Sequence, residues 1–358
     1  MMKEFASEEY INHKTRFFSA LLIFFVIMQH AVNINGRITG FSQSEGFNFY
    51  MQSFVSAGIS IVAVPLFFII SGYYFFYHVQ TFTFDVYKEK VKKRIGTLVI
   101  PYFIVSIWAF LLLYTLQHIS ALKPFFKYGL IEDYGLYDYV YALVIHPLAY
   151  QLWFLRNLFC IILVTPVLYF LIKKAGKGFI IALLVLWILF TEKFSDGILT
   201  TITFFSAGAY FALSRIQLPK LNNPILVVSS LLVWLSLILI FIIYSNSATG
   251  LFHYLDELSV LAGIFALWCL YDVLKISYNV HTGFTAKIAV YTFFIYLFHE
   301  PLLSMILKLL FVILGKTILS STVIYWLAPL ITIFSCLCFA ILLKKYFPSI
   351  YTVINGGR

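Results

Sequence analysis

The chain is organised around repeated runs of about 20 apolar residues, the length that an α-helix needs to cross the hydrocarbon core of a bilayer. About ten such runs can be placed, of which the fifth and sixth are short. They extend over Phe17 to Asn35, Phe54 to Tyr77, Ile95 to Gln117, Leu152 to Ile172, Gly178 to Thr191, Leu199 to Ser214, Pro224 to Tyr244, Leu255 to Leu274, Ala286 to Leu314 and Thr322 to Tyr346. The pattern predicts an all-α, polytopic membrane protein.

Composition supports a membrane protein. Hydrophobic residues make up 62% of the 358 residues, charged residues only 11%, and the mean hydropathy is +0.93. Soluble domains rarely have this balance. We therefore expect a single integral-membrane domain over residues 1–358, whose first apolar run is a retained helix rather than a cleaved signal peptide.

The cysteines and the missing motifs narrow the chemistry. All four cysteines lie inside apolar runs, which argues against a disulfide framework and against a zinc site. No HExxH, GxSxG or CxxC pattern occurs, so metalloprotease, serine hydrolase and thiol redox functions have no support and we expect no metal. The cysteines are Cys160, Cys269, Cys336 and Cys338.

The net charge of +10 fits membrane topology better than nucleic-acid binding. Lysine and arginine recur in alternate loops instead of clustering on a soluble module. Because cytoplasmic loops carry an excess of these residues, the alternation predicts an even number of spans with both termini in the cytoplasm. The external segments would then hold only Arg37, Lys123, Lys127, Lys193 and Lys316.

Titratable residues inside the apolar runs are costly and often functional, and His30, Arg156 and His299 are the first candidates among them. At 1.5 Å per residue from the cytoplasmic edge, His30 lies roughly 20 Å deep and His299 roughly 18 Å deep. Arg156, which enters from the outside, lies roughly 24 Å from the same face. The similar depths indicate that the two histidines and the arginine could line one cavity.

Each of these residues also has a structural interpretation. His30 could simply bond a neighbouring helix. His299, followed by Glu300 and Pro301, could belong to a helix kink with satisfied polar groups. Arg156 could extend its side chain toward the external interface. The residues alone leave these alternatives open.

Two neighbouring segments suggest binding of a ligand from the cytoplasmic side. Ser71 and Gly72 would let a ligand or another backbone approach closely, although small residues also serve helix packing. The following segment, Tyr87 to Tyr102, concentrates positive charge that includes Lys93 and Arg94. Such a cluster could bind a phosphorylated donor or anionic lipids, or could act only as a topology determinant.

The longest external segment, His118 to Gln151, alternates tyrosines with carboxylates. This pattern suits a sugar, because tyrosine rings stack on its apolar face and carboxylates accept hydrogen bonds from its hydroxyls. Interfacial aromatic belts give the same pattern in many membrane proteins. The part from Tyr137 to Ala149 is typical of an amphipathic helix on the outer surface.

In this order along the chain, the motifs resemble the acyltransferase 3 family of integral-membrane acyltransferases. The resemblance covers nearly the whole chain, and the ordered set is more specific than any one motif. The motifs are His30 in the first helix, VPLFFIISGYYFF (Val64 to Phe76), KRIGTLVIPY (Lys93 to Tyr102), QLWFLRNL (Gln151 to Leu158), TFFSAGAYFA (Thr203 to Ala212) and FFIYLFHEPLL (Phe293 to Leu303).

One position departs from the family pattern. Members typically carry an arginine eleven residues before the histidine, where this chain has Ser19. The nearest arginine, Arg16, lies about one helical turn earlier. The role of the histidine carries over to His30, whereas the role of the arginine carries over only if Arg16 reaches the same place.

The resemblance implies an enzyme that moves an acyl group, most often acetyl, from cytosolic acyl-CoA as co-substrate to a hydroxyl of a surface or lipid-linked carbohydrate. Arg16, Lys93 and Arg94 would pair with the donor's phosphates. Its pantetheine arm would then pass Ser71 and Gly72 toward the membrane interior.

In the implied reaction, His30 acts as general base toward the acceptor hydroxyl, or is itself acylated and relays the group. Arg156, or the hydroxyl of Tyr296, would stabilise the oxyanion. His299 and Glu300 would orient the acceptor or His30. The sequence does not separate direct transfer from the relay.

Two other functions remain open at this stage. A transporter or exporter of a lipid-linked saccharide would use the same polar groups for binding without bond chemistry, although the chain lacks the internal repeats common among transporters. A non-catalytic membrane scaffold would tolerate loss of His30. We expect a multi-pass protein of the cytoplasmic (inner) membrane, with the bilayer but no nucleic acid as partner; the acyl group, the acceptor and formation of a homodimer are left open.

Overall fold

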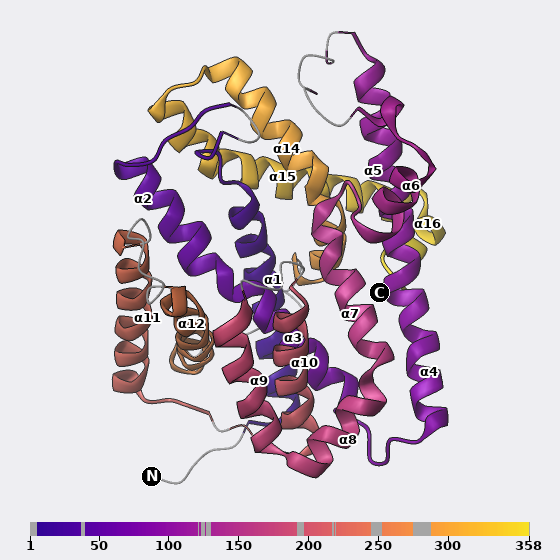
Figure 1. Ribbon diagram of the computed structural model, residues 1–358, viewed down its shortest axis with the longest axis vertical. Coiled ribbons are helices and arrows are strands. Elements are labelled where there is room, and N and C mark those ends of the chain that lie inside the picture. The colour runs from indigo at the N-terminus through magenta and orange to yellow at the C-terminus, as the bar shows by residue number, and fades with distance from the viewer. Residues whose placement is uncertain are drawn as a thin grey trace. The chain divides into compact units, whose positions relative to one another are not determined.

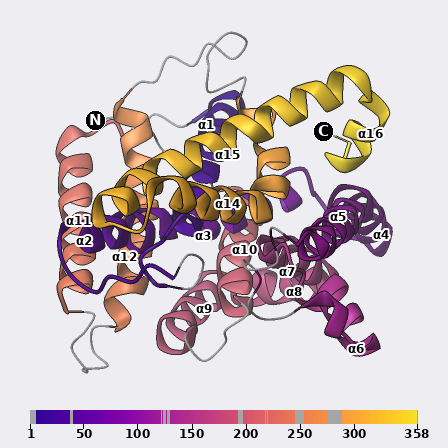
Figure 2. The same cartoon turned by 90° about the horizontal axis from the view of Figure 1, so that it is seen from above.

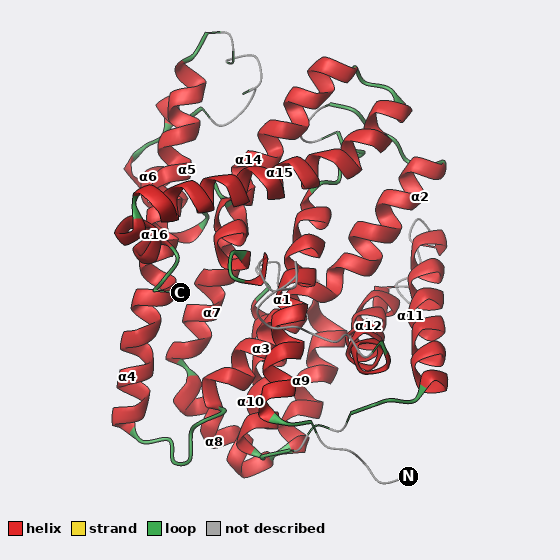
Figure 3. Cartoon of the chain, turned by 180° about the vertical axis from the view of Figure 1, so that it is seen from behind, coloured by secondary structure: helices red, strands yellow, loops and turns green. Residues whose placement is uncertain are grey.

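A computed structural model describes residues 6–36, 40–120, 122, 126, 130–191, 197–216, 218, 220–244, 253–274 and 288–357. Throughout these ranges the regular structure is helical, and the described residues include no β-strand (Figure 3). The nearest approach to a sheet is an isolated antiparallel bridge between Asn35 and Ser42. The all-α prediction is therefore confirmed.

Several helices are long and apolar enough to cross a membrane, so the prediction of a multi-pass protein is confirmed. Within the described ranges, seven helical segments qualify: Glu8–His30, Phe47–Phe76, Phe84–His118, Pro224–Tyr244, Tyr254–Val273, Thr292–Leu314 and Ile318–Tyr346. The pair Tyr150–Leu163 and Thr165–Ala175, bent by 65°, counts as an eighth if it forms one span. The fifth and sixth predicted runs form the shorter helices Lys177–Phe190 and Ile198–Leu213. The count of about ten and the cytoplasmic termini stay predictions.

The contacts divide the chain into two compact units. Unit 1 consists of Met1–Ile34, Gln43–Phe82 and Val164–Thr292, and unit 2 of Asn35–Ser42, Thr83–Leu163 and Phe293–Arg358. Each unit is assembled from separated stretches of the sequence. His30 belongs to unit 1, whereas Arg156 and His299 belong to unit 2, so the prediction of one cavity lined by all three stays a prediction.

Unit 1 contains two pairs of closely packed helices (Figure 1). Its elements are α1 (Glu8–His30), α2 (Phe47–Ser53), the π-helix η1 (Phe54–Ile59), η2 (Ser60–Val62), α3 (Ala63–Phe76), α8 (Thr165–Ala175), α9 (Lys177–Phe190), α10 (Ile198–Leu213), α11 (Pro224–Tyr244) and α12 (His253–Val273). Helix α3 packs on α10 and α11 packs on α12. Helix α1 is capped by the Ser7 hydroxyl, which accepts from the Tyr10 N–H at 3.2 Å.

Glycines allow α3 and α10 to touch backbone to backbone. A β-carbon on Gly72 would lie 2.0 Å from the Phe205 carbonyl oxygen, and one on Gly208 would lie 2.0 Å from the carbonyl oxygen of Ile69. Neither position can hold a larger residue without moving a helix, since close approach of this kind requires the smallest side chain. Of the two roles predicted for Gly72, ligand approach and helix packing, the structure shows helix packing.

Unit 2 contains two long helices that follow one another at the C-terminal end of the chain. Its elements are α4 (Phe84–Arg94), the π-helix η3 (Ile95–Val99), α5 (Ile100–His118), η5 (Ile131–Asp133), α6 (Leu136–Val140), the π-helix η6 (Tyr141–Ile145), η7 (Tyr150–Leu152), α7 (Trp153–Leu163), α14 (Thr292–Leu314), α15 (Ile318–Tyr346) and α16 (Pro348–Ile354). The short α16 turns back at the end of α15 (Figure 2). The segment predicted as a helix from Tyr137 to Ala149 is helical as far as Ile145, over α6 and η6, and the side chain of Tyr137 is exposed. Its place on the outer membrane surface stays a prediction.

The glycine contact predicts a stability difference between two helical glycines of unit 1. Gly208→Ala should lower the free energy of unfolding by about 1–3 kcal/mol, because the new methyl group overlaps the Ile69 carbonyl. Gly178→Ala in α9 is the matched control, since no atom lies within 4 Å of its added carbon. Thermal unfolding in detergent measures the midpoints of the two variants. Equal midpoints would show that Gly208 is not needed for the contact between α3 and α10.

Candidate active site

His30 is the last residue of α1, and its side chain is half-buried. The carbonyls of a final helical turn have no partners within the helix and need others in an apolar setting. The Met28 carbonyl accepts from the Ala31 N–H at 3.2 Å and from the Ser56 hydroxyl at 2.8 Å. Ser56 belongs to the π-helix η1, a type of turn that is frequent at functional sites. The turn that carries His30 is therefore fixed to η1.

Buried amides secure the chain just beyond His30. Gln52 accepts from the Asn33 N–H at 3.2 Å, donates to the Asn33 side-chain oxygen at 3.1 Å and donates to that of Asn48 at 3.0 Å. All three side chains are at most 1% exposed. Buried polar networks with satisfied partners rigidify the elements that they join. This network joins the end of α1 to α2 and limits the positions that His30 can adopt.

The other unit 1 residues that the sequence singled out occupy more ordinary positions. Arg16 is exposed on α1, and Ser19, which stands at the family's arginine position, donates back to the Thr15 carbonyl at 2.9 Å. Ser71 is half-buried on α3, and Gly72 packs on α10. Donor binding by Arg16, Ser71 and Gly72 stays a prediction.

In unit 2 the predicted kink is present in α14, where Glu300 leaves the helical conformation with φ −115° and ψ 140°. Pro301 has no N–H, so the Leu297 carbonyl one turn earlier loses its helical donor. The Gln151 amide replaces it, donating to the Leu297 carbonyl at 3.0 Å and to the Glu300 carbonyl at 3.1 Å. A side chain from η7 thus completes the hydrogen bonding of the broken helix.

Further hydrogen bonds make this junction reciprocal. The Tyr296 hydroxyl donates to the Gln151 carbonyl at 2.6 Å, and the Tyr150 hydroxyl donates to the Glu300 carboxyl group at 3.2 Å. The same carboxyl group accepts from the Ser304 N–H at 3.4 Å. Glu300 as a whole is only 1% exposed. We call Tyr150, Gln151, Tyr296 and Glu300 the α14 clasp.

His299 lies next to the clasp and is completely buried. Its Nδ1 lies 2.8 Å from the Tyr296 carbonyl oxygen and 3.3 Å from that of Ile295. Because a carbonyl only accepts, Nδ1 must carry the proton, which leaves the lone pair of the neutral ring on Nε2. The backbone of α14 therefore selects the tautomer of His299 in which Nε2 can accept a hydrogen bond.

Of the basic candidates of unit 2, Arg156 has hydrogen-bond partners within the protein. The Arg156 guanidinium donates to the Ile145 carbonyl and, through Nε, to the Asn157 side-chain oxygen at 3.2 Å. Lys93 and Arg94 lie at the end of α4, where the helix continues without a break through η3 into α5. Oxyanion stabilisation by Arg156 and phosphate binding by Lys93 and Arg94 stay predictions.

Sequence reasoning missed the residues that hold these candidates in place. Gln52 and Gln151 are neutral and flank apolar runs, so they lacked the signal that charge gives to His30 or Arg156. The detectable signal for Gln151 was the proline at 301, which frees a carbonyl that some polar side chain must satisfy. Its position in the sequence could not be inferred from that signal, because the two residues are far apart along the chain.

Comparison with known proteins decides the family. The family model described as an acyltransferase domain matches residues 19–345, a stretch that runs through both units. The chain belongs to the acyltransferase 3 family. A curated relative, succinoglycan biosynthesis protein ExoH of Rhizobium meliloti (strain 1021), is 26% identical over 361 residues, which cover 94% of this chain and 90% of the relative. No solved structure matches the chain.

Family membership confirms the resemblance found in the sequence and makes this acyltransferase 3 protein an enzyme of acyl transfer. Members share the reaction class; the roles of single residues follow from local chemistry. The role of His30 as the catalytic base therefore stays a prediction.

The α14 clasp predicts the stability of two variants of this acyltransferase. Gln151→Leu should destabilise the protein by about 1–3 kcal/mol for each buried carbonyl left without a donor. Tyr150→Phe, which removes a single hydroxyl donor to Glu300, should cost less. Thermal unfolding in lipid nanodiscs compares them, and a smaller loss for Gln151→Leu than for Tyr150→Phe would contradict the account of the kink.

Proposed function

We propose that this acyltransferase transfers an acyl group, with acetyl as the first candidate, from cytosolic acyl-CoA to a hydroxyl of a cell-surface or lipid-linked carbohydrate. The observation that carries the proposal is the continuous acyltransferase match over residues 19–345, within which His30 closes α1 on a turn fixed by buried hydrogen bonds. The protein works in the cytoplasmic membrane, which it crosses several times.

A carbohydrate acceptor is supported by two observations. The curated relative is named for succinoglycan biosynthesis. On this chain, Tyr137 and Tyr141 stack with ring centroids 5.7 Å apart, and Tyr137 is 74% exposed. Exposed aromatic rings offer the flat apolar surface on which sugar rings pack. The acceptor therefore approaches from the side predicted to be external.

The proposed chemistry places His30 at the acceptor hydroxyl. The neutral imidazole takes the hydroxyl proton while the oxygen attacks the thioester carbonyl, and the tetrahedral intermediate then expels the CoA thiolate, which receives the proton. General base catalysis of this kind contributes typically about 10²- to 10⁴-fold. In the relay variant the His30 nitrogen attacks the thioester first and displaces the CoA thiolate. The acceptor hydroxyl then attacks the acyl-imidazole, which frees the imidazole, and the hydroxyl proton passes to the CoA thiolate.

The unit 2 candidates have supporting roles in this proposal. Arg156 stabilises the oxyanion, a contribution that is large when the donors are pre-positioned. The other sequence candidate, the Tyr296 hydroxyl, already donates its single proton to the Gln151 carbonyl. His299, with its lone pair on Nε2, and Glu300 orient the acceptor. Arg16, Lys93 and Arg94 pair with donor phosphates, and the arm of the donor passes Ser71 and Gly72.

The direct test is CoA release from acetyl-CoA by purified protein in lipid, with a cell-envelope fraction as acceptor. Wild-type protein should turn over, and His30→Ala should lose about 10²- to 10⁴-fold of that rate while keeping its unfolding midpoint. Undiminished turnover by His30→Ala would remove this residue from the mechanism. Absence of turnover with every acyl donor and envelope fraction would favour a transporter of a lipid-linked saccharide instead.

The amide network predicts a separate effect on the rate. Gln52→Leu removes the groups that hold Asn33, so kcat should fall about 10- to 100-fold through misplacement of His30, whereas KM for acetyl-CoA stays near the wild-type value. The neighbouring Ser53→Ala, which leaves the network intact, is the control. Steady-state kinetics of the folded variants checks this split; a change confined to KM would show that Gln52 does not position His30.

A further inference from the structure

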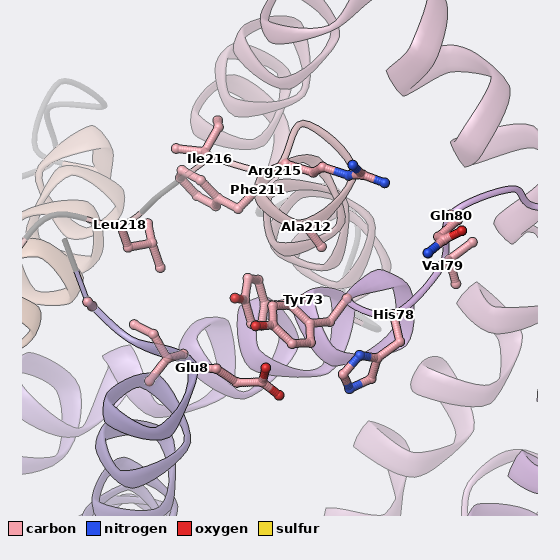
Figure 4. A pocket seen from close by; sticks show the side chains of 13 residues that line it. Glu8, Tyr73, His78, Val79, Gln80, Phe211, Ala212, Arg215, Ile216 and Leu218 are labelled. Atoms are coloured by element: carbon pink, nitrogen blue, oxygen red, sulfur yellow. The ribbon is translucent and has the colours of Figure 1, made fainter.

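Unit 1 contains a cavity of about 520 Å³ that has no role in the chemistry above. The start of α1, the end of α3 with the residues after it, and the end of α10 with the residues after it form its wall (Figure 4). Its volume is within the range of small-molecule sites. Its polar lining consists of Glu8, Tyr73, Tyr77, His78, Gln80 and Arg215.

Arg215 is held in a backbone conformation that arginine normally avoids. It follows α10 with φ +49°, and it is the one non-glycine residue with positive φ among the described residues. Helices commonly end on glycine in this conformation, because a β-carbon is disfavoured there. Backbone strain of this kind persists only where the surrounding structure imposes it, and strained residues are enriched at ligand-binding sites. Arg215 is one of the residues that line the cavity (Figure 4).

The guanidinium of Arg215 is available to a ligand. Within the described part of the chain, the ion pairs join His13 to Glu9 and Lys14 to Asp272, and neither involves Arg215. A planar guanidinium without a carboxylate partner matches the geometry of a phosphate group. The cavity therefore offers one site for an anion.

The opposite wall offers aromatic rings and a hydrogen-bond acceptor. The rings of Tyr73 and Tyr77 lie 5.0 Å apart, and the His78 ring packs edge-on against Tyr77 at 4.7 Å. Glu8, from the start of α1, adds a carboxylate to the lining beside these rings. Rings for a base, a carboxylate for ribose hydroxyls or an amino group, and an arginine for phosphate together match a nucleotide.

A buried ion pair supports the cavity wall. Leu218 accepts from the Ala6 N–H at 3.0 Å, and the Leu221 N–H donates to Asp272 at 3.0 Å. Asp272 pairs with Lys14 of α1 at 2.6 Å, and both side chains are at most 1% exposed. These contacts hold the residues that follow Arg215 against α1 and α12. The wall is thus preformed rather than assembled by the ligand.

We infer that this cavity binds the phosphorylated nucleotide end of the acyl-CoA donor, with Arg215 as its phosphate-binding residue. The identity of the ligand rests on the proposed function; the nucleotide character rests on the lining. All three wall segments lie outside the apolar runs or at their ends on the side predicted to be cytoplasmic, where such a donor is found.

The test uses adenosine 3′,5′-bisphosphate, which contains the nucleotide end of CoA without the arm, titrated calorimetrically into the full chain in phosphatidylcholine nanodiscs. Wild-type protein should bind it, and Arg215→Gly should bind at least about tenfold more weakly. Glycine suits positive φ, so the variant should unfold at the wild-type temperature or above. Lys177→Ala, an exposed charge on the predicted cytoplasmic side that does not line the cavity, should bind like wild type.

The outcomes of this titration distinguish a nucleotide site from a lipid headgroup site, and distinguish failure of the inference from failure of the proposed function. Equal affinities of wild type and Arg215→Gly, or no binding by wild type, would overturn the inference. Binding of the two proteins to phosphatidylglycerol vesicles is measured alongside. If Arg215→Gly weakens vesicle binding but leaves bisphosphate binding unchanged, the inference is also overturned, since Arg215 would then contact lipid headgroups. Arg215-dependent bisphosphate binding without any CoA release by wild type would contradict the proposed function but leave the nucleotide site in place.

Discussion

Every polar group inside a bilayer needs a partner within the protein, because no water is available there to supply one. This constraint explains the best-defined features of both units. At the end of α1, the Met28 carbonyl is taken by Ser56, and the chain beyond it is held by Gln52. At the kink of α14, the carbonyls of Leu297 and Glu300 are taken by Gln151. In both places, satisfying the backbone also fixes a histidine.

The two sites proposed in unit 1 lie near opposite ends of α1. Near the N-terminal end, Lys14 is buried in an ion pair with Asp272 and lies 3.8 Å over the ring of Trp268. A charge paired and surrounded in this way is costly to remove from its place, so it serves as a fixed anchor for the cavity wall. At the C-terminal end lies His30. A donor held by its nucleotide at the first end would extend along α1 toward the second.

Much of the fold could be read from the sequence, because hydropathy and helix length act locally. The apolar runs predicted the helices, and even the short runs from Gly178 and Leu199 correspond to α9 and α10. Proline at 301 predicted the kink at Glu300. The partners could not be predicted, since the Gln151 contact with Leu297 and the contact of Gly208 with Ile69 depend on tertiary packing. Arg215 was seen only as a loop charge, because its backbone conformation has no sequence signature.

The central claim is that an acyl group moves from a thioester to a carbohydrate hydroxyl through His30. Acetyl-CoA labelled in its acetyl group, supplied to proteoliposomes with envelope carbohydrate, tests it most directly. The account predicts that the label enters the carbohydrate as a base-labile ester with wild-type protein, and that this incorporation is lost with a folded His30→Gln variant. Label that stays in the donor with wild-type protein, or reaches the carbohydrate equally with the variant, would contradict it.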